Sequence, residues 1–234
     1  MTTAPDPRMP DMPADADRSR GRYVHLLEGA PAGVDQRYVL GDVGGGAIRI
    51  RSTRVTSTPV ARSEFDIRLT PAGVSVVLRW VGSGAGVVRA ATIECAEVDD
   101  GLEIRREIEG RHLDPVHLPG SLILPSLVLG GLMPAGEGRI FHPGDGAEPD
   151  DFLPRPVSMT REDLGDEVVM VGGSDVVGTA VAWRMSGALD LEGVDVIEGG
   201  LLLRRTTGAV VATLTEVSGP WPRPSEWPSA VRPR

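Results

Sequence analysis

Hydrophobic and polar residues alternate along most of this chain with a period of two. Residues 64–69 read Glu-Phe-Asp-Ile-Arg-Leu, and residues 102–109 carry apolar side chains at 102, 104 and 108 with charged ones between. Such alternation predicts strands with one buried face. Similar segments span residues 22–28, 34–40, 47–56, 73–81, 87–98, 139–142, 157–163, 167–171, 176–185, 189–196, 201–206 and 210–217.

Glycine-rich and aspartate-rich turns, such as those at 42–45, 99–101 and 172–175, separate several of these segments. No regular exchange of strands and helices supports a parallel sheet. An antiparallel sheet of about a dozen strands must curl, because its twist accumulates. We therefore expect an all-β fold whose curved sheet forms a barrel or half-barrel, with one short helical lid at residues 121–133.

The composition predicts three parts along the chain. Residues 1–20 are rich in proline and aspartate and have no apolar run, so we expect a disordered leader. Residues 21–218 form a single barrel or half-barrel domain. Residues 219–234 hold five prolines, four of them around two tryptophans, and form a tail. The leader has no apolar centre of a secretory signal, so we expect a cytoplasmic protein.

Charge and length narrow the choice of partners. The formal net charge is −9, and no basic cluster suited to phosphates is present, so we expect no nucleic-acid partner. The longest apolar stretch, residues 121–133, is shorter than the ~20 residues of a membrane span, and we expect no membrane insertion. The single cysteine, Cys95, lies between apolar residues and two glutamates, which favours a buried and unreactive thiol.

The chain contains no lysine, because all 24 basic residues are arginine. A Walker phosphate loop, a Schiff-base enzyme and a lysine general base are therefore excluded. No Gly-x-Ser-x-Gly, Cys-x-x-Cys, His-Glu-x-x-His or dinucleotide motif is present. We expect no cofactor. His112 and His117 flank Asp114, but Pro115 and the absence of a known ligand spacing favour loop histidines, and no metal site is predicted.

The order of segments resembles a known family. An opening strand pair at 22–40 leads into a meander, then into the proline-bounded apolar segment 118–127, the segment 138–143 and a second meander that includes residues 199–205. This order is similar to that of LolA-like half-barrel proteins and their uncharacterised relatives. The resemblance implies a curved sheet and a short helical lid around an apolar ligand such as an acyl chain. The missing export signal departs from the family and argues against periplasmic carriage.

Four residues are our catalytic candidates. His142 enters a tight glycine loop with Asp145 three residues later, and this pair suits acid–base chemistry at a barrel mouth. A surface turn explains the same residues. Strict alternation places Arg106 on the apolar face of its strand, where it needs a carboxylate or an anionic ligand, unless a bulge or strand end frees it. Glu97 continues an apolar face and is a candidate partner of Arg106 or an acid with a raised pKa.

Four further residues are candidates for ligand binding. Trp183 and Met185 share one face of a late strand, which suits either a core or a ligand platform. Ile104 on the apolar face and Leu127 in the lid segment are expected to line the cavity.

These observations support three functions. The first is a cofactor-independent cyclase or isomerase that folds an apolar substrate in the barrel cavity, by analogy with small barrels that close polyketide rings, including spiroketal-forming enzymes in secondary metabolism. The alternative is a non-catalytic binder or carrier of a lipid-like or acyl-chain ligand. The third is an interaction module that docks a partner through the proline–tryptophan tail.

Overall fold

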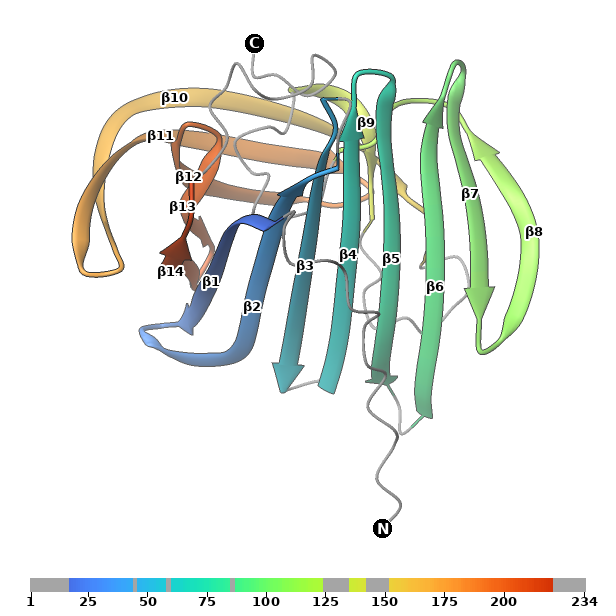
Figure 1. The fold of residues 1–234 in the computed structure, drawn as a ribbon, viewed down its shortest axis with the longest axis horizontal. Coiled ribbons are helices and arrows are strands. Elements are labelled where there is room, and N and C mark those ends of the chain that lie inside the picture. Colours follow the sequence, from blue (N-terminus) through green and yellow to red (C-terminus); the bar gives the residue numbers. More distant parts are fainter. Residues whose placement is uncertain are drawn as a thin grey trace.

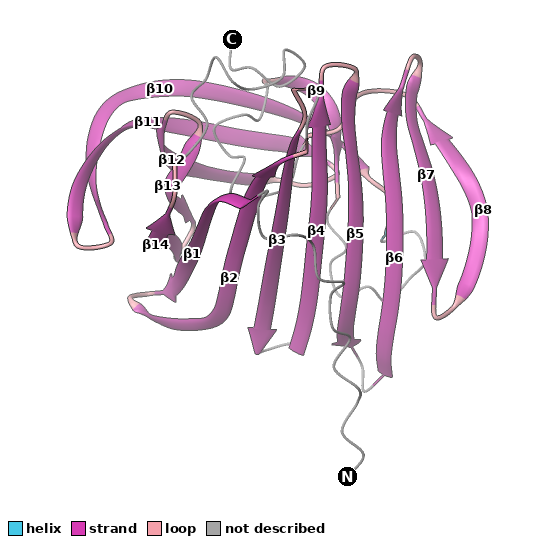
Figure 2. Ribbon diagram, in the orientation of Figure 1, coloured by secondary structure: helices cyan, strands magenta, loops and turns pink. Residues whose placement is uncertain are grey.

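The computed structural model describes residues 17–43, 46–57, 60–84, 87–123, 135–141 and 152–220. Within these ranges the chain forms strands and no α-helix (Figure 2). No helix of this part is long and apolar enough to cross a membrane. The strands are β1 (Asp17–Leu27), β2 (Ala30–Asp42), β3 (Ile48–Ser57), β4 (Val60–Thr70), β5 (Gly73–Gly84), β6 (Val87–Val98), β7 (Gly101–Ile108), β8 (Arg111–Leu118), β9 (Gly136–Ile140), β10 (Arg155–Val171), β11 (Ser174–Gly187), β12 (Leu191–Glu198), β13 (Leu201–Thr207) and β14 (Val210–Ser218).

All fourteen strands belong to one antiparallel sheet in the order β8-β7-β6-β5-β4-β3-β2-β1-β14-β13-β12-β11-β10-β9. The chain thus forms two meanders, β1 to β8 and β9 to β14. Pairing between β1 and β14 joins the meanders in the middle of the sheet. Figure 1 shows the broad N-terminal meander and the long β10/β11 hairpin, which curves strongly away from it.

The all-β, antiparallel and curved fold is confirmed. The sheet is unclosed, with β8 and β9 at its two edges, so it is a half-barrel rather than a barrel. Most of the predicted helical lid, at 124–133, lies outside the described residues. Its first residues are extended: the Ile123 amide donates to the Arg139 carbonyl at 2.7 Å, and the Arg139 amide donates to the Ser121 carbonyl at 2.9 Å. This bridge covers the outer edge of β9.

Strand β1 begins at Asp17, so residues 17–20 belong to the sheet although their composition placed them in the leader. Two contacts explain the difference. The Arg18 guanidinium pairs with the Asp42 carboxylate at 2.5 Å, and Ser19 is buried beside Tyr38. Residues 1–16 of the leader and 221–234 of the tail lie outside the described residues.

Glycine pairs set two of the hairpin turns. Gly172 and Gly173, between β10 and β11, have φ of +58° and +85°. Gly199 and Gly200, between β12 and β13, have φ of +57° and +90°. Two consecutive positive φ values define the two-residue turn whose twist matches that of antiparallel strands, and glycine adopts them without a steric penalty.

The main core lies on one face of the N-terminal meander, here called the inner face. Buried side chains of β2 to β7 line it, including Leu40, Ile67 and Ile93. Residues from the connection between β8 and β10 pack against them: Phe152 is fully buried, and its ring lies 5.4 Å from that of Trp80. The connection between β8 and β10 therefore contributes to the main core through Phe152.

The C-terminal meander buries both faces of its strands. Cross-strand pairing places Met159 opposite Met185 on the inner face, in a small separate cluster. Val169 pairs with Val176 on the outer face of these strands, where both pack with the main core cluster. A register shift at Asp163 and Gly165 causes this switch, because one extra residue turns every later side chain to the opposite side. Residues 157–171 therefore form one long strand with a bulge, where the sequence predicted two separate strands.

The histidine-containing segment 111–118 is strand β8, so the prediction that His112 and His117 lie in a loop is wrong. Pro115 is compatible with β8 because this strand is at the edge of the sheet, where one row of amides pairs with no neighbouring strand. Both histidines are largely exposed, and within the described residues no three His, Cys, Asp or Glu side chains are grouped to hold a metal ion.

Candidate functional site

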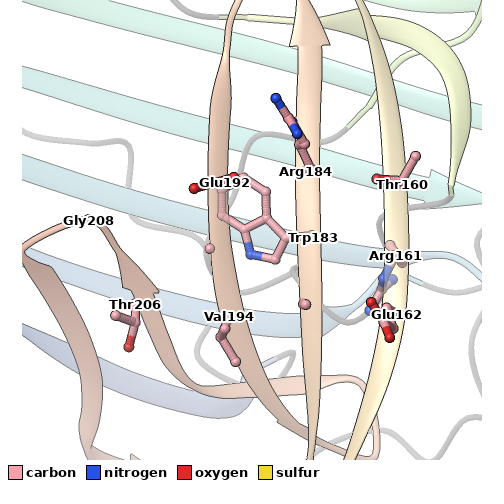
Figure 3. A pocket seen from close by; sticks show the side chains of 11 residues that line it. Thr160, Arg161, Glu162, Trp183, Arg184, Glu192, Val194, Thr206 and Gly208 are labelled. Atoms are coloured by element: carbon pink, nitrogen blue, oxygen red, sulfur yellow. The ribbon is translucent and has the colours of Figure 1, made fainter.

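An open groove of about 600 Å³ lies over β10 to β13. Strands β10, β11 and β12 cross the groove, and Gly208, in the turn after β13, lies at one side of it (Figure 3). The lining residues are Thr160, Arg161, Glu162, Ala182, Trp183, Arg184, Glu192, Gly193, Val194, Thr206 and Gly208.

Cross-strand pairing orders the groove into two rows on the outer face. The first row joins Glu162, Ala182, Val194 and Thr206 across the four strands. The second row joins Thr160, Arg184 and Glu192. The first row is mostly apolar or neutral and the second is largely charged, so the groove changes from apolar to polar along the strands.

The apolar row continues a strip that begins in the core. Ala180 and Val196 pair with each other and are buried, at 6% and 0% exposure. Two residues further along the same strands, Ala182 and Val194 pair and are only partly buried. Two residues beyond, Arg184 pairs with Glu192 and both are exposed. Burial thus decreases stepwise from the core to a charged edge.

A buried polar network lies behind the groove, on the inner face of the same strands. Trp183 donates from Nε1 to the Asp195 carboxylate at 2.9 Å. Arg205 donates to both oxygens of Asp195, at 2.7 and 2.6 Å, and its guanidinium lies 5.1 Å from the centre of the Trp183 ring. Because the Asp195 side chain is only 1% exposed, these bonds replace its hydration.

Gly193 allows the Trp183 ring to take this position. A Cβ atom at residue 193 would lie 2.7 Å from the ring and 2.4 Å from the Thr206 carbonyl oxygen. Arg161 pairs with Trp183 from the other side, on β10. Burial lowers the pKa of Arg161, and Asp195 opposes that shift. The network therefore holds two guanidinium groups around one carboxylate.

The candidate ligand-binding residues separate in the structure. Trp183 borders the groove, whereas Met185 is buried in a smaller cluster with Val157, Met159 and Ile123. Ile104 is fully buried in the main core and does not line the groove. Leu127 lies outside the described residues.

Two of the four catalytic candidates, Arg106 and Glu97, lie in the described residues, at different positions along the β6/β7 pairing. His142 and Asp145 lie outside the described residues. Arg106 is on the inner face, as strand alternation predicted, and is 9% exposed. Glu97 accepts hydrogen bonds from the backbone amides of Val74 and Leu122, at 3.2 and 3.0 Å. These bonds give Glu97 a structural role, because they hold the connection after β8 against the sheet.

Cys95 is 3% exposed, and burial raises its pKa to about 12, with a further contribution from Glu97. The thiolate needed for nucleophilic chemistry is therefore almost absent near neutral pH. The prediction that the Cys95 thiol is buried is confirmed, and its lack of reactivity stays a prediction.

Sequence reasoning missed a second polar group, at His25, Gln36 and Arg54 on the inner face. Arg54 follows Ile48, Ile50 and Ser52 with a period of two. The alternation that singled out Arg106 would therefore have identified Arg54 as well.

Comparisons with known proteins give one similarity. No family model matches the chain, and no curated protein matches it. Among solved structures it is similar to a beta-barrel-like protein of the domain of unknown function DUF1849 from Brucella abortus. The two are 11% identical, the match covers 88% of this chain and 99% of that one, and the TM-score is 0.48. None of these findings names a LolA-like family, so that resemblance stays a prediction.

Proposed function

We propose that this protein binds a small amphiphilic molecule, with an apolar body and a polar end, in the groove over β10 to β13. One observation carries the proposal: the stepwise change from buried apolar to exposed charged side chains along β11 and β12. A volume of about 600 Å³ falls within the range of roughly 300–1,000 Å³ that is usual for small-molecule sites.

The groove suggests how such a ligand is oriented. Its apolar body lies over Ala182 and Val194, where it removes partly exposed apolar surface from water. Its polar end lies between Arg184 and Glu192, which offer a donor of hydrogen bonds and an acceptor on adjacent strands. This arrangement supports binding or carriage of a lipid-like molecule and needs no chemical step.

A groove-filling substitution tests the proposal. Ala182→Trp places an indole over the apolar row, so we expect it to weaken binding of a dansyl-labelled medium-chain fatty acid by about tenfold or more. Val177→Trp is the matched control, because Val177 lies on the same strand, is 58% exposed and does not line the groove.

Two measurements decide the result. Fluorescence titration gives the affinity of each variant, and native mass spectrometry of freshly purified protein detects a ligand that co-purifies. If Ala182→Trp and Val177→Trp bind the labelled acid as tightly as the unmodified protein, the groove is not the binding site.

The finer hypothesis of a cofactor-independent cyclase or isomerase stays a proposal for the same groove. Glu162 and Glu192 are the carboxylates that line it and would be the groups that move a proton. Incubation with a linear dihydroxyketone, followed by chromatography of the products, tests ring closure. Activity that survives both Glu162→Gln and Glu192→Gln would argue against this assignment.

A further inference from the structure

Three polar side chains on β1, β2 and β3 form a group on the inner face, and strand β14 separates these strands from β13, the nearest strand of the groove. Gln36 on β2 pairs with Arg54 on β3 and with Tyr23 on β1. His25 lies two residues beyond Tyr23, so it occupies the same face. We call His25, Gln36 and Arg54 the inner-face polar cluster.

Two members of this cluster are buried with an unused polar atom. His25 and Gln36 are each 5% exposed. Neither the Nε2 atom of His25 nor the Oε1 atom of Gln36 has a hydrogen-bond partner in the described structure. The Gln36 amide nitrogen is used, because it donates to the Ser52 hydroxyl at 3.3 Å. Buried polar atoms are usually hydrogen-bonded, so two neighbouring exceptions indicate a missing partner.

Arg54 contributes a positive charge that the described residues do not neutralise. No described carboxylate makes an ion pair with it. Arg54 is exposed as a whole residue, at the rim of the buried positions 48, 50 and 52, although desolvation lowers the pKa of its guanidinium. The nearby Asp35 carboxylate is held by other residues, because Arg22 and Arg37 donate to it at 2.7 and 3.1 Å. The cluster thus combines a guanidinium with unused donor and acceptor positions.

The electrostatics of His25 agree with this arrangement. Burial and the charge of Arg54 lower the pKa of His25 to about 4, although the Gln36 side chain and Asp35 oppose the shift. The imidazole is therefore neutral near pH 7 and adds no second charge. The Gln36 side chain lies beside the His25 ring, although Nε2 of His25 and Oε1 of Gln36 each lack a hydrogen-bond partner in the described structure.

We propose that the inner-face polar cluster binds the carboxylate of an aliphatic acid, with Arg54 as the charged donor and His25 and Gln36 as neutral polar partners. Guanidinium groups match carboxylates in shape and charge, and a neutral histidine can donate one more hydrogen bond. Phe65 on β4 is a partly buried apolar side chain that packs against the main core, and in this proposal the aliphatic chain lies against it. This site is independent of the groove.

Calorimetric titration with sodium dodecanoate, sodium acetate and dodecanol tests the proposal. We expect Arg54→Gln to weaken dodecanoate binding by about tenfold to a hundredfold, because a charge-assisted hydrogen bond is lost. Arg79→Gln is the matched control: it removes the same charge from an exposed position on β5 and should leave binding unchanged. Ala182→Trp should retain the Arg54-dependent binding, which separates this site from the groove.

The three probes distinguish the sources of the carboxylate. Acetate binding that depends on Arg54 supports recognition of the carboxylate alone, whereas binding of dodecanoate but not acetate supports an amphiphilic acid. Dodecanol lacks the charge and should bind more weakly than dodecanoate. The proposal fails if neither acid binds, if dodecanol binds as tightly as dodecanoate, or if Arg54→Gln binds dodecanoate normally.

A second measurement does not depend on any variant. Addition of dodecanoate to the unmodified protein should shift the NMR signals of the His25 ring, while those of the exposed His112 should not move. Unchanged His25 signals at saturating dodecanoate would also overturn the proposal.

Discussion

Asp195 tests the energetics of this fold, because its single carboxylate accepts the hydrogen bonds of two buried side chains. It accepts from Trp183 and twice from Arg205, whose side chain is 14% exposed. Asp195→Ala removes every acceptor at once. We expect the free energy of unfolding to fall by about 3–5 kcal/mol, the cost typical of breaking a buried ion pair by deleting one partner.

Two further variants separate the loss of charge from the loss of hydrogen bonds in this decrease of the free energy of unfolding. Asp195→Asn keeps an oxygen that accepts from Trp183 but loses the charge, so we expect a smaller loss of roughly 1–3 kcal/mol. The double variant Asp195→Leu with Arg205→Met removes both charges, which is often close to neutral for a buried pair. The Trp183 donor then stays unsatisfied and the nearby Arg161 loses the attraction of Asp195, but the Arg205 charge is gone, so we expect the double variant to be more stable than Asp195→Ala.

Urea denaturation followed by tryptophan fluorescence and by circular dichroism measures these free energies. Glu103→Ala is the control, because its partner Arg105 is 67% exposed and such surface pairs contribute about 0–1 kcal/mol. The reasoning is refuted if Asp195→Ala is within about 0.5 kcal/mol of the unmodified protein, a difference typical of an uncritical surface site.

Three further predictions follow from individual residues. The pKa of His25 is about 4 in the folded protein, below the ~6.5 of an unfolded histidine, so protonation of His25 favours the unfolded state. The free energy of unfolding should therefore be highest above pH 6.5 and decrease as the pH falls toward 4. Urea denaturation should show a flatter pH profile for a His25→Gln variant. Glu109 has a φ of +52°, so Glu109→Asn should raise the free energy of unfolding by about 0.5–1 kcal/mol, whereas an unchanged or lower value would contradict a strained turn. Cys95, with its pKa raised to about 12, should resist iodoacetamide at pH 7.5 in folded protein and react in urea; rapid labelling without denaturant would disprove its burial.

The pattern of polar and apolar residues predicted most strands, because the two faces of a strand are set by residues that are neighbours in the sequence. Alternation at 64–69 and 102–108 requires one buried and one exposed face, and a strand is the element that supplies them. Strand 111–118 was not predicted, because a register shift between Leu113 and Val116 interrupts its alternation and its apolar side chains are only partly buried. The bulge in β10 was read as a break, because a shifted register interrupts the period although the strand continues.

The candidate site was predicted only in part. Trp183 was chosen from its position in a strand and does border the groove. The pattern also placed Arg106 correctly on the inner face. The other groove residues were missed, since Glu162, Arg184 and Glu192 look like ordinary surface charges until three strands bring them together.

The sequence by itself determined the fold class and the strand-forming segments, because periodicity and turn residues act over a few neighbours. Only the tertiary structure decided which strands meet, above all the pairing of β1 with β14 that places residues almost two hundred positions apart side by side. It also decided that Phe152 packs into the main core against Trp80 and that a groove opens over β10 to β13. Such choices depend on long-range packing and register, where a shift by one residue exchanges the two faces of a sheet.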